Sequence, residues 1–312
     1  MAVLNALNVT HHFDGLAAVA DFNLNLEPYE LVGIIGPNGA GKTTIFNLIT
    51  GVYRATRGSI SFAGTEIVGK TPSQITSLGI ARTFQNIRLF KELTVLDNVR
   101  IAHYGKAGYN PLEALLHLGR FRKAEDDIIA HSMDLLACLK LESYADEPSK
   151  NLSYGLQRRL EIARALATKP QLLLLDEPAA GMNPNEVAQL LEFIQWIRKE
   201  FSLTILLIEH QMHLVMNICE RLLVLDFGET IAEGQPRAIQ NDPRVLEVYL
   251  GECVDDGIGH RQHGTESQQH DECRVFPQYS AGQYFQSCPA GCIPGLAGIN
   301  RDGLSCHLCP LY

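Results

Sequence analysis

The sequence has no long apolar run. Among its 312 residues, no stretch reaches the length of about 18 consecutive apolar residues that a membrane-spanning helix requires. The first 15 residues also lack the basic start and the apolar segment that are typical of a secretory signal. We therefore expect a chain that works in the cytoplasm and does not itself cross a membrane.

Positive charge is also in deficit. The chain has 26 lysines and arginines against 35 aspartates and glutamates, which gives a formal net charge of -9. A surface with this balance disfavours nucleic acid as the main partner. We therefore expect no nucleic-acid partner.

Cysteine is scarce in most of the chain. Only Cys138 and Cys219 precede residue 250, whereas the other six of the eight fall between Cys253 and Cys309. In the cytoplasm we expect them to be thiols. The composition changes at the same point, so we expect one domain over residues 1–253 and a separate tail over residues 254–312.

The tail is rich in Gly, Gln, Ser and Pro and has no helical or strand period, which predicts disorder. A zinc site is the alternative, because Cys288-x₃-Cys292 and Cys306-x₂-Cys309 resemble the spacing of four thiolate ligands. A tail read from a shifted reading frame is a third interpretation.

A glycine-rich segment follows the short apolar run 31–35 and precedes a helical pattern. This strand–loop–helix setting, with the spacing G-x-x-x-x-G-K-[ST], predicts a loop whose backbone amides surround phosphates. We expect Lys42 to contact the β- and γ-phosphates of ATP and Thr43 to bind Mg²⁺. The predicted nucleotide-binding residues of the loop are Gly36, Pro37, Asn38, Gly39, Ala40, Gly41, Lys42, Thr43 and Thr44.

A second apolar run, 171–175, ends in Asp176-Glu177-Pro178. A carboxylate at the end of a buried strand is well placed to bind Mg²⁺ beside the phosphates, and we assign this role to Asp176. The next residue, Glu177, can polarise the attacking water as a general base. Together with the glycine-rich loop, this pair predicts a Mg·ATP hydrolase.

Residues 152–166, LSYGLQRRLEIARAL, lie between these two motifs. They resemble the signature motif of ABC ATPases, and the order and spacing of all three motifs over residues 1–251 are similar to that family. The resemblance implies an α/β fold: a P-loop NTPase ABC ATPase domain with a RecA-like core, an antiparallel β part and a helical subdomain at about 89–155. It also implies a dimer in which Ser153 and Gly155 of one subunit close over the ATP of the other.

Further positions match family positions one at a time. Phe13 resembles the aromatic residue that stacks on adenine. Gln85 looks like the glutamine that touches Mg²⁺ or the attacking water, and His210 resembles the histidine that contacts the γ-phosphate. Asn183 stands where many ABC ATPases carry aspartate.

Three segments are similar to the ATP-binding subunits of branched-chain amino-acid importers: RTFQNIRLF (82–90), PAAGMNP (178–184) and IEHQM (208–212). The resemblance implies a subunit that hydrolyses ATP at the cytoplasmic face of the cell membrane. Its implied partners are a second ATP-binding subunit, two membrane-spanning permeases and, indirectly, a solute-binding protein outside the membrane. Nothing in the motifs touches the solute.

Related systems are the alternatives. ATPases for urea or short-amide uptake and for lipopolysaccharide export share much of the pattern. ABC ATPases that move no solute form a rival class. They fit less well, because translation factors of this kind usually carry two ATPase domains and repair ATPases insert coiled coils, whereas no heptad run occurs here.

Leu156 departs from the family pattern, which usually has Gln or Glu at this position. Ser153 and Gly155, to which the family's main γ-phosphate contacts belong, are retained, so we predict an active but slowed enzyme. The variant Leu156→Gln should raise turnover modestly in a steady-state ATPase assay. A large increase would instead indicate that the natural loop is severely impaired.

Overall fold

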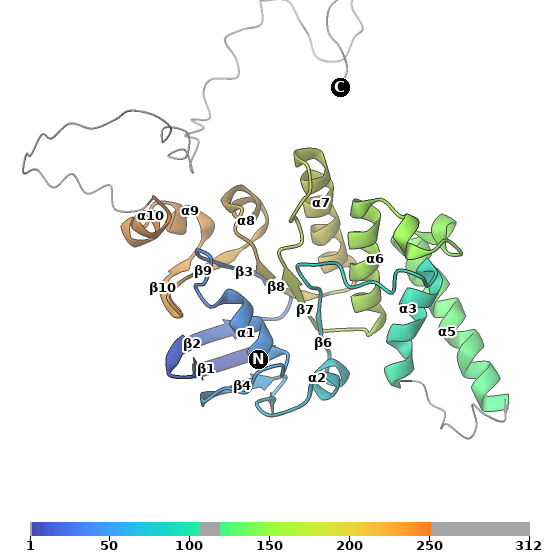
Figure 1. The fold of residues 1–312 in the computed structure, drawn as a ribbon, viewed down its shortest axis with the longest axis horizontal. Helices are drawn as coiled ribbons and strands as arrows, with labels where there is room; N and C mark the ends of the chain where they lie inside the picture. The colour runs from blue at the N-terminus through green and yellow to red at the C-terminus, as the bar shows by residue number, and fades with distance from the viewer. Residues whose placement is uncertain (1, 107–118, 251–312) are drawn as a thin grey trace, which may run out of the picture. The chain divides into compact units, whose positions relative to one another are not determined.

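The computed structural model describes residues 2–106 and 119–250, whose arrangement is drawn in Figure 1. All of them belong to a compact unit that spans Met1–Gly259. The second unit, His260–Tyr312, lies outside the described residues, as do the alternatives of disorder and a zinc site that we predicted for the tail.

A six-stranded sheet in the order β10-β9-β3-β8-β7-β6 forms the centre of the fold. Five neighbouring strands are parallel, and β10 joins one edge in antiparallel orientation. Every residue of β3, β7 and β8 is buried, as expected for parallel strands that are covered on both faces. The strands are β3 (Leu31–Ile35), β6 (Ile80–Arg82), β7 (Leu172–Asp176), β8 (Thr204–Ile208), β9 (Arg221–Asp226) and β10 (Glu229–Gly234).

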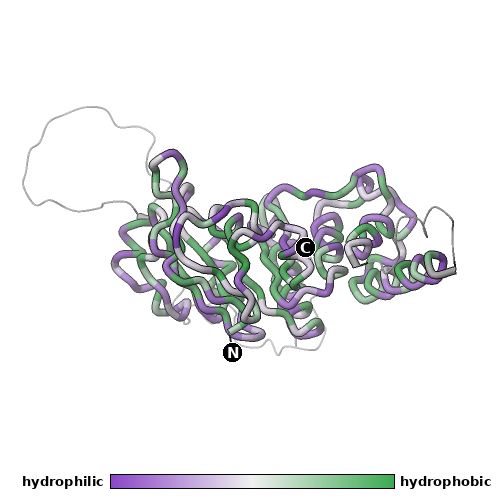
Figure 2. The backbone as a smooth tube through the Cα atoms, turned by 90° about the horizontal axis from the view of Figure 1, so that it is seen from below, coloured by the Kyte–Doolittle hydropathy of each residue, from purple (hydrophilic) through white to green (hydrophobic). Residues whose placement is uncertain are grey.

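A four-stranded antiparallel sheet in the order β2-β1-β4-β5 packs against this centre. Its strands are β1 (Leu4–Phe13), β2 (Leu16–Leu26), β4 (Arg57–Phe62) and β5 (Thr65–Glu66). Helix α1 (Lys42–Ile49) contributes Phe46 to one hydrophobic core with Phe22 and Phe62 of this sheet and Leu174 of the parallel one. Figure 2 shows the hydrophobic stretches gathered in the strands at the centre.

Helices α3 (Val95–His103), α5 (Gly119–Cys138) and α6 (Tyr154–Ala167) pack together beside the parallel sheet (Figure 1). The other helices are α2 (Pro72–Leu78), α7 (Pro184–Glu200), α8 (Met212–Ile218), α9 (Pro236–Gln240) and α10 (Pro243–Leu250). Within the described part of the chain, no helix is long and apolar enough to span a bilayer.

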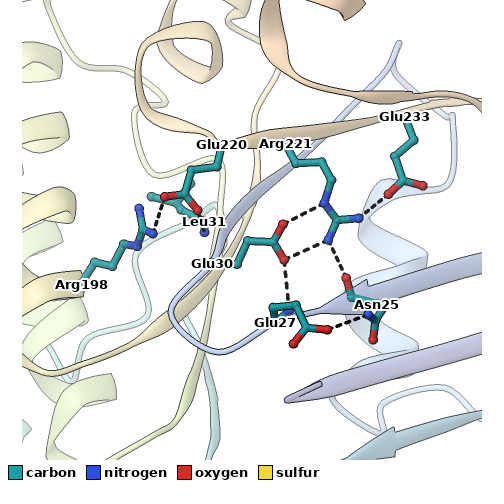
Figure 3. A network of polar contacts seen from close by, with 8 residues as sticks. All are labelled: Asn25, Glu27, Glu30, Leu31, Arg198, Glu220, Arg221 and Glu233. Atoms are coloured by element: carbon teal, nitrogen blue, oxygen red, sulfur yellow. Dashed lines mark hydrogen bonds and ion pairs between the residues drawn. The ribbon is translucent and has the colours of Figure 1, made fainter. Parts of the chain in front are cut away.

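An ion-pair network joins both sheets near the start of β3, as Figure 3 shows. Arg221 of β9 binds Glu30 through two hydrogen bonds of 2.8 and 2.9 Å, and it also contacts Glu233 of β10 and the backbone carbonyl of Asn25 in β2. Burial raises the pKa of Glu30, but Arg221 and the other partners outweigh it, so the pKa lies below its ordinary value of 4.5. The network therefore favours the folded state when Glu30 is ionised.

We predict that Arg221→Met lowers the free energy of unfolding by about 2 kcal/mol at pH 7, because charged hydrogen bonds are lost from a partly buried site. Because the folded-state pKa of Glu30 is depressed, this benefit is present above the ordinary pKa of 4.5 and is lost as the pH falls through the lower folded value. Urea denaturation at several pH values measures both effects.

Arg244→Met is the matched control, since Arg244 pairs with Asp242 but its side chain is 67% exposed. Its effect on the free energy of unfolding should be much smaller, because an exposed ion pair contributes little. Equal effects of the two substitutions would contradict the stabilising role of the network.

Candidate active site

The phosphate loop joins β3 to α1, as the sequence predicts. Gly36 and Gly41 both have positive φ angles, of 149° and 98°. A Cβ atom at Gly36 would lie 2.2 Å from the carbonyl oxygen of Leu225, and one at Gly41 would lie 2.6 Å from that of Ala18. Glycine is therefore required at both positions for the loop to pass β9 and β2.

Lys42 begins α1 and its side chain turns back into the loop. Its ammonium donates hydrogen bonds to the carbonyl oxygens of Gly36 and Pro37, at 2.7 and 2.8 Å. Burial lowers the pKa of Lys42 below its ordinary value of 10.5, while Glu177 and Asp176 act in the opposite direction. A buried cation with two carboxylates nearby is thus present in the loop. Of the remaining loop residues, Asn38, Gly39 and Thr43 are exposed, Thr44 is half-buried and Ala40 is buried.

Asp176 ends β7, and Glu177 follows directly. The register pairs Asp176 with Ile208, so β7 and β8 end side by side. Glu177 adopts the left-handed conformation, with a φ of 43°, and its amide donates a 2.9 Å hydrogen bond to the carbonyl of Ile208. This conformation is uncommon for a residue with a side chain, and such residues cluster at functional sites.

The carboxylate of Glu177 is the point on which two other predicted residues converge. The side-chain amide of Gln85 donates to its Oε2 at 2.6 Å, and Nδ1 of His210 lies 3.7 Å from the same oxygen. The three residues come from the ends of β6, β7 and β8 and are far apart in sequence. The structure thus brings together Gln85, Asp176, Glu177 and His210.

Arg82, which the sequence analysis gave no role, binds the predicted metal ligand. Its guanidinium lies 2.7 Å from Oδ2 of Asp176, and both side chains are only 6% exposed. Arg82 also donates to the Asn47 side chain of α1 at 2.7 Å. Its position directly before the Gln85 segment was visible in the sequence, but its carboxylate partner is 94 residues away.

Arg158 is a second residue that the sequence analysis gave no role. It is fully buried and donates to the backbone carbonyls of Phe84 and Gln85, at 2.7 and 2.8 Å. Its guanidinium also binds Glu161 at 2.7 Å, and Glu161 in turn accepts hydrogen bonds from the amides of Phe84 and Arg88. Helix α6 therefore holds the Gln85 segment through both its carbonyls and its amides.

Ser153 and Gly155 do not join the cluster around Glu177. They line a hollow of about 260 Å³ together with Leu156, Met182 and residues of α7, and none of the phosphate-loop residues lines it. Ser153 precedes α6 but makes no capping hydrogen bond, so its exposed hydroxyl is not used by its own helix.

Phe13 lies at the end of β1, where it pairs with Leu16 of β2. Its ring is 40% exposed and makes edge contacts with His11 and Tyr53, at centroid distances of 4.6 and 5.1 Å. The residue that we predicted to stack on adenine is thus part of an exposed aromatic cluster. An aromatic face in this setting is available for stacking.

Two further residues support the loop after Glu177. Glu209 is fully buried and accepts a 3.0 Å hydrogen bond from the amide of Ala179, and burial raises the pKa of its carboxyl above the ordinary value of 4.5. Asn183, noted above for replacing aspartate, caps α7 in a reciprocal pair with Glu186. Both residues therefore position the segment between β7 and α7.

The chain is similar to a known protein family and to characterised members of it. The ABC transporter family matches residues 19–180. The high-affinity branched-chain amino acid transport ATP-binding protein LivG of Escherichia coli K12 is 44% identical over 251 residues, which cover 80% of this chain and 98% of that protein. This chain belongs to the ABC transporter family.

Other comparisons of this ABC transporter chain agree. BraF of Pseudomonas aeruginosa, a protein with the same description as LivG, is 43% identical over 251 residues, 80% of this chain and 98% of that one. The branched-chain amino acid ATP-binding cassette transporter family matches residues 229–252. The ADP conformation of MJ1267, an ATP-binding cassette of an ABC transporter, superimposes with a TM-score of 0.71 at 33% identity and covers 81% of this chain and 100% of that chain. The predicted fold class and the ABC-type ATPase are thereby confirmed.

The buried Arg158–Glu161 pair yields a prediction about stability. Arg158→Met leaves Glu161 without its cation at 1% exposure, and we expect a loss of about 3–5 kcal/mol in the free energy of unfolding. The double variant Arg158→Met/Glu161→Leu should be less destabilised than the sum of the single variants, because the uncompensated charge is gone. Urea denaturation of all four proteins tests this, and additive losses would contradict the pairing.

Proposed function

We propose that this chain energises an importer of branched-chain amino acids by hydrolysing ATP. The convergence of Gln85 and His210 on the Glu177 carboxylate, next to Asp176 and the phosphate loop, is the observation that carries the hydrolytic role. The solute rests on the descriptions of LivG and BraF and on the family match at residues 229–252. The proposed domain is 1–253, with the helical subdomain at about 89–155.

The loop amides and Lys42 are well suited to bind the phosphates of ATP, because the glycines leave the backbone open and α1 directs its N-terminus at the same anion. The exposed Phe13 offers a face for the adenine ring. Ser153 and Gly155 line a hollow of their own, which supports their action on the nucleotide of a second subunit.

Mg²⁺ prefers oxygen ligands, and the three residues that we assign to it provide them: the Asp176 carboxylate, the Thr43 hydroxyl and the Gln85 side-chain oxygen. All three side chains offer oxygen atoms, so the donor set fits Mg²⁺, although the buried Asp176 carboxylate is paired with Arg82 in the structure. When bound, Mg²⁺ would neutralise charge that develops on the phosphates.

Glu177 is the residue that we assign to the attacking water. Its Oε2 accepts a hydrogen bond from the side-chain amide of Gln85 and lies near His210, so both residues help to position the carboxylate. It would orient the water and take up its proton. His210, which is half-exposed and whose Nδ1 lies 3.7 Å from the same Glu177 oxygen, would contact the γ-phosphate.

The remaining partners follow from this assignment. The chain would work at the cytoplasmic face of the membrane, as a dimer with a second ATP-binding subunit. Two membrane-spanning permeases would dock on it, and a solute-binding protein would deliver the amino acid to them.

We predict that Glu177→Gln lowers the ATPase rate by about 10²–10⁴-fold, because the general base is lost. ATP binding should persist and the ATP-bound dimer should accumulate, as measured by size-exclusion chromatography with light scattering. Glu192→Gln, the same change at an exposed position of α7, is the control and should hydrolyse ATP normally. Rapid hydrolysis by the Glu177 variant would overturn its role.

The importer assignment is tested by purifying the Glu177→Gln variant with ATP from detergent-solubilised membranes. Two permeases and a related ATPase should co-purify, and cells that lack the active chain should lose uptake of labelled leucine, isoleucine and valine. The importer proposal would be wrong if export-type membrane partners co-purified, if only ribosomes or DNA co-purified, or if the cells lost only urea uptake. None of these outcomes would contradict the ATPase activity.

A further inference from the structure

We propose that Arg82 is a positioning residue that occupies the Asp176 carboxylate until a divalent cation replaces it. The proposal rests on the proposed function, in which Asp176 binds Mg²⁺ beside ATP. It concerns a residue that neither the motifs nor the comparisons assign to the site.

Arg82 contacts the predicted metal ligand directly. Nη2 of Arg82 lies 2.7 Å from Oδ2 of Asp176, and each side chain is only 6% exposed. In such a buried place a carboxylate without a partner is costly, and a guanidinium compensates it as a metal ion would. Two cations would therefore compete for the same buried oxygen atoms.

Arg82 has other partners that can hold its guanidinium when it releases Asp176. Its Nη1 donates to Asn47 at 2.7 Å and approaches the Thr50 hydroxyl at 3.4 Å. The guanidinium also lies over the rings of Phe46 and Phe84, 5.3 and 5.1 Å from their centroids. These contacts involve α1 and the Gln85 segment and do not include Asp176.

The hydrogen bonding of the Arg82 guanidinium is incomplete. Its Nε is buried and has no hydrogen-bond partner among the described residues. Arg158, which is held firmly, has the same unpartnered Nε, so this feature shows only that the contacts of Arg82 are not fully satisfied. A short shift toward Asn47 would therefore not break a fully satisfied arrangement.

Arg88 provides a matched control on the same ring. Its guanidinium lies 4.0 Å from the centroid of Phe84, and both arginines line a groove of about 370 Å³ with Phe90 and Arg164. The contacts of Arg88 do not extend to Asp176. The two residues therefore separate an effect at the carboxylate from an effect on the groove or on the Gln85 segment.

The experiment measures the affinity for ADP in EDTA and in saturating Mn²⁺, on the full chain and without turnover. The dissociation constant in EDTA divided by that in Mn²⁺ reports how strongly the protein's own ligands hold the metal. Arg82→Met should raise this ratio on the order of tenfold, because a charge–charge contact no longer has to be broken when the metal binds. Arg82→Lys, which keeps the charge, should fall near the wild type, and Arg88→Met should lie within about twofold of it.

Thermal denaturation distinguishes a change in metal binding from a variant that is only poorly folded. Without ligand, Arg82→Met should melt below the wild type, because Asp176 loses its cation, and Mn²⁺ with ADP should stabilise it more than it stabilises the wild type. A ratio for Arg82→Met that equals or falls below the wild-type ratio overturns the proposal. Absence of ADP binding by the wild type itself would instead overturn the proposed function.

Discussion

The register of three parallel strands is the constraint on which the site depends. β3, β7 and β8 run side by side as fully buried apolar strands, so their carboxyl ends meet at one edge of the sheet. Glu177 follows the end of β7 directly, His210 follows β8 after one intervening residue, and Lys42 follows β3 after the phosphate loop. A slip of one residue in β7 would turn Asp176 to the other face of the sheet and away from the phosphate loop.

Charge balance is the second condition, because this edge collects acidic groups. The carboxyl groups of Asp176, Glu177 and the buried Glu209 lie close together, and each is stabilised by a different partner. Asp176 has the Arg82 guanidinium, Glu177 has the neutral amide of Gln85, and Glu209 has a raised pKa and a backbone amide. Neighbouring carboxylates repel one another, so each needs its own cation, hydrogen-bond donor or bound proton. Lys42 completes the balance from the phosphate loop.

Much of the fold and of the candidate site could be predicted from the sequence, because the decisive motifs consist of consecutive residues. The phosphate loop, the Asp176–Glu177 pair and the runs of the buried strands are read from consecutive residues, and the structure confirms the predicted strands and the helix that begins at Lys42. Arg82 and Arg158 are different, since their partners lie 94 and 73–74 residues away. An arginine in a motif looks like a solvated charge until the fold shows which carboxylate or carbonyl it meets.

The same long-range contacts connect the two halves of the site. Glu177 is held by Gln85, the backbone of Gln85 is held by Arg158, and Arg158 lies one turn into the helix that Ser153 precedes. Each contact in this series is short, and the Arg158 side chain is fully buried. The Gln85 segment therefore cannot shift by itself without leaving the Glu161 carboxylate or two backbone carbonyls unsatisfied. A displacement of the Gln85 backbone would consequently disturb α6 and the loop at Ser153, which in the proposed dimer faces the nucleotide of the other subunit.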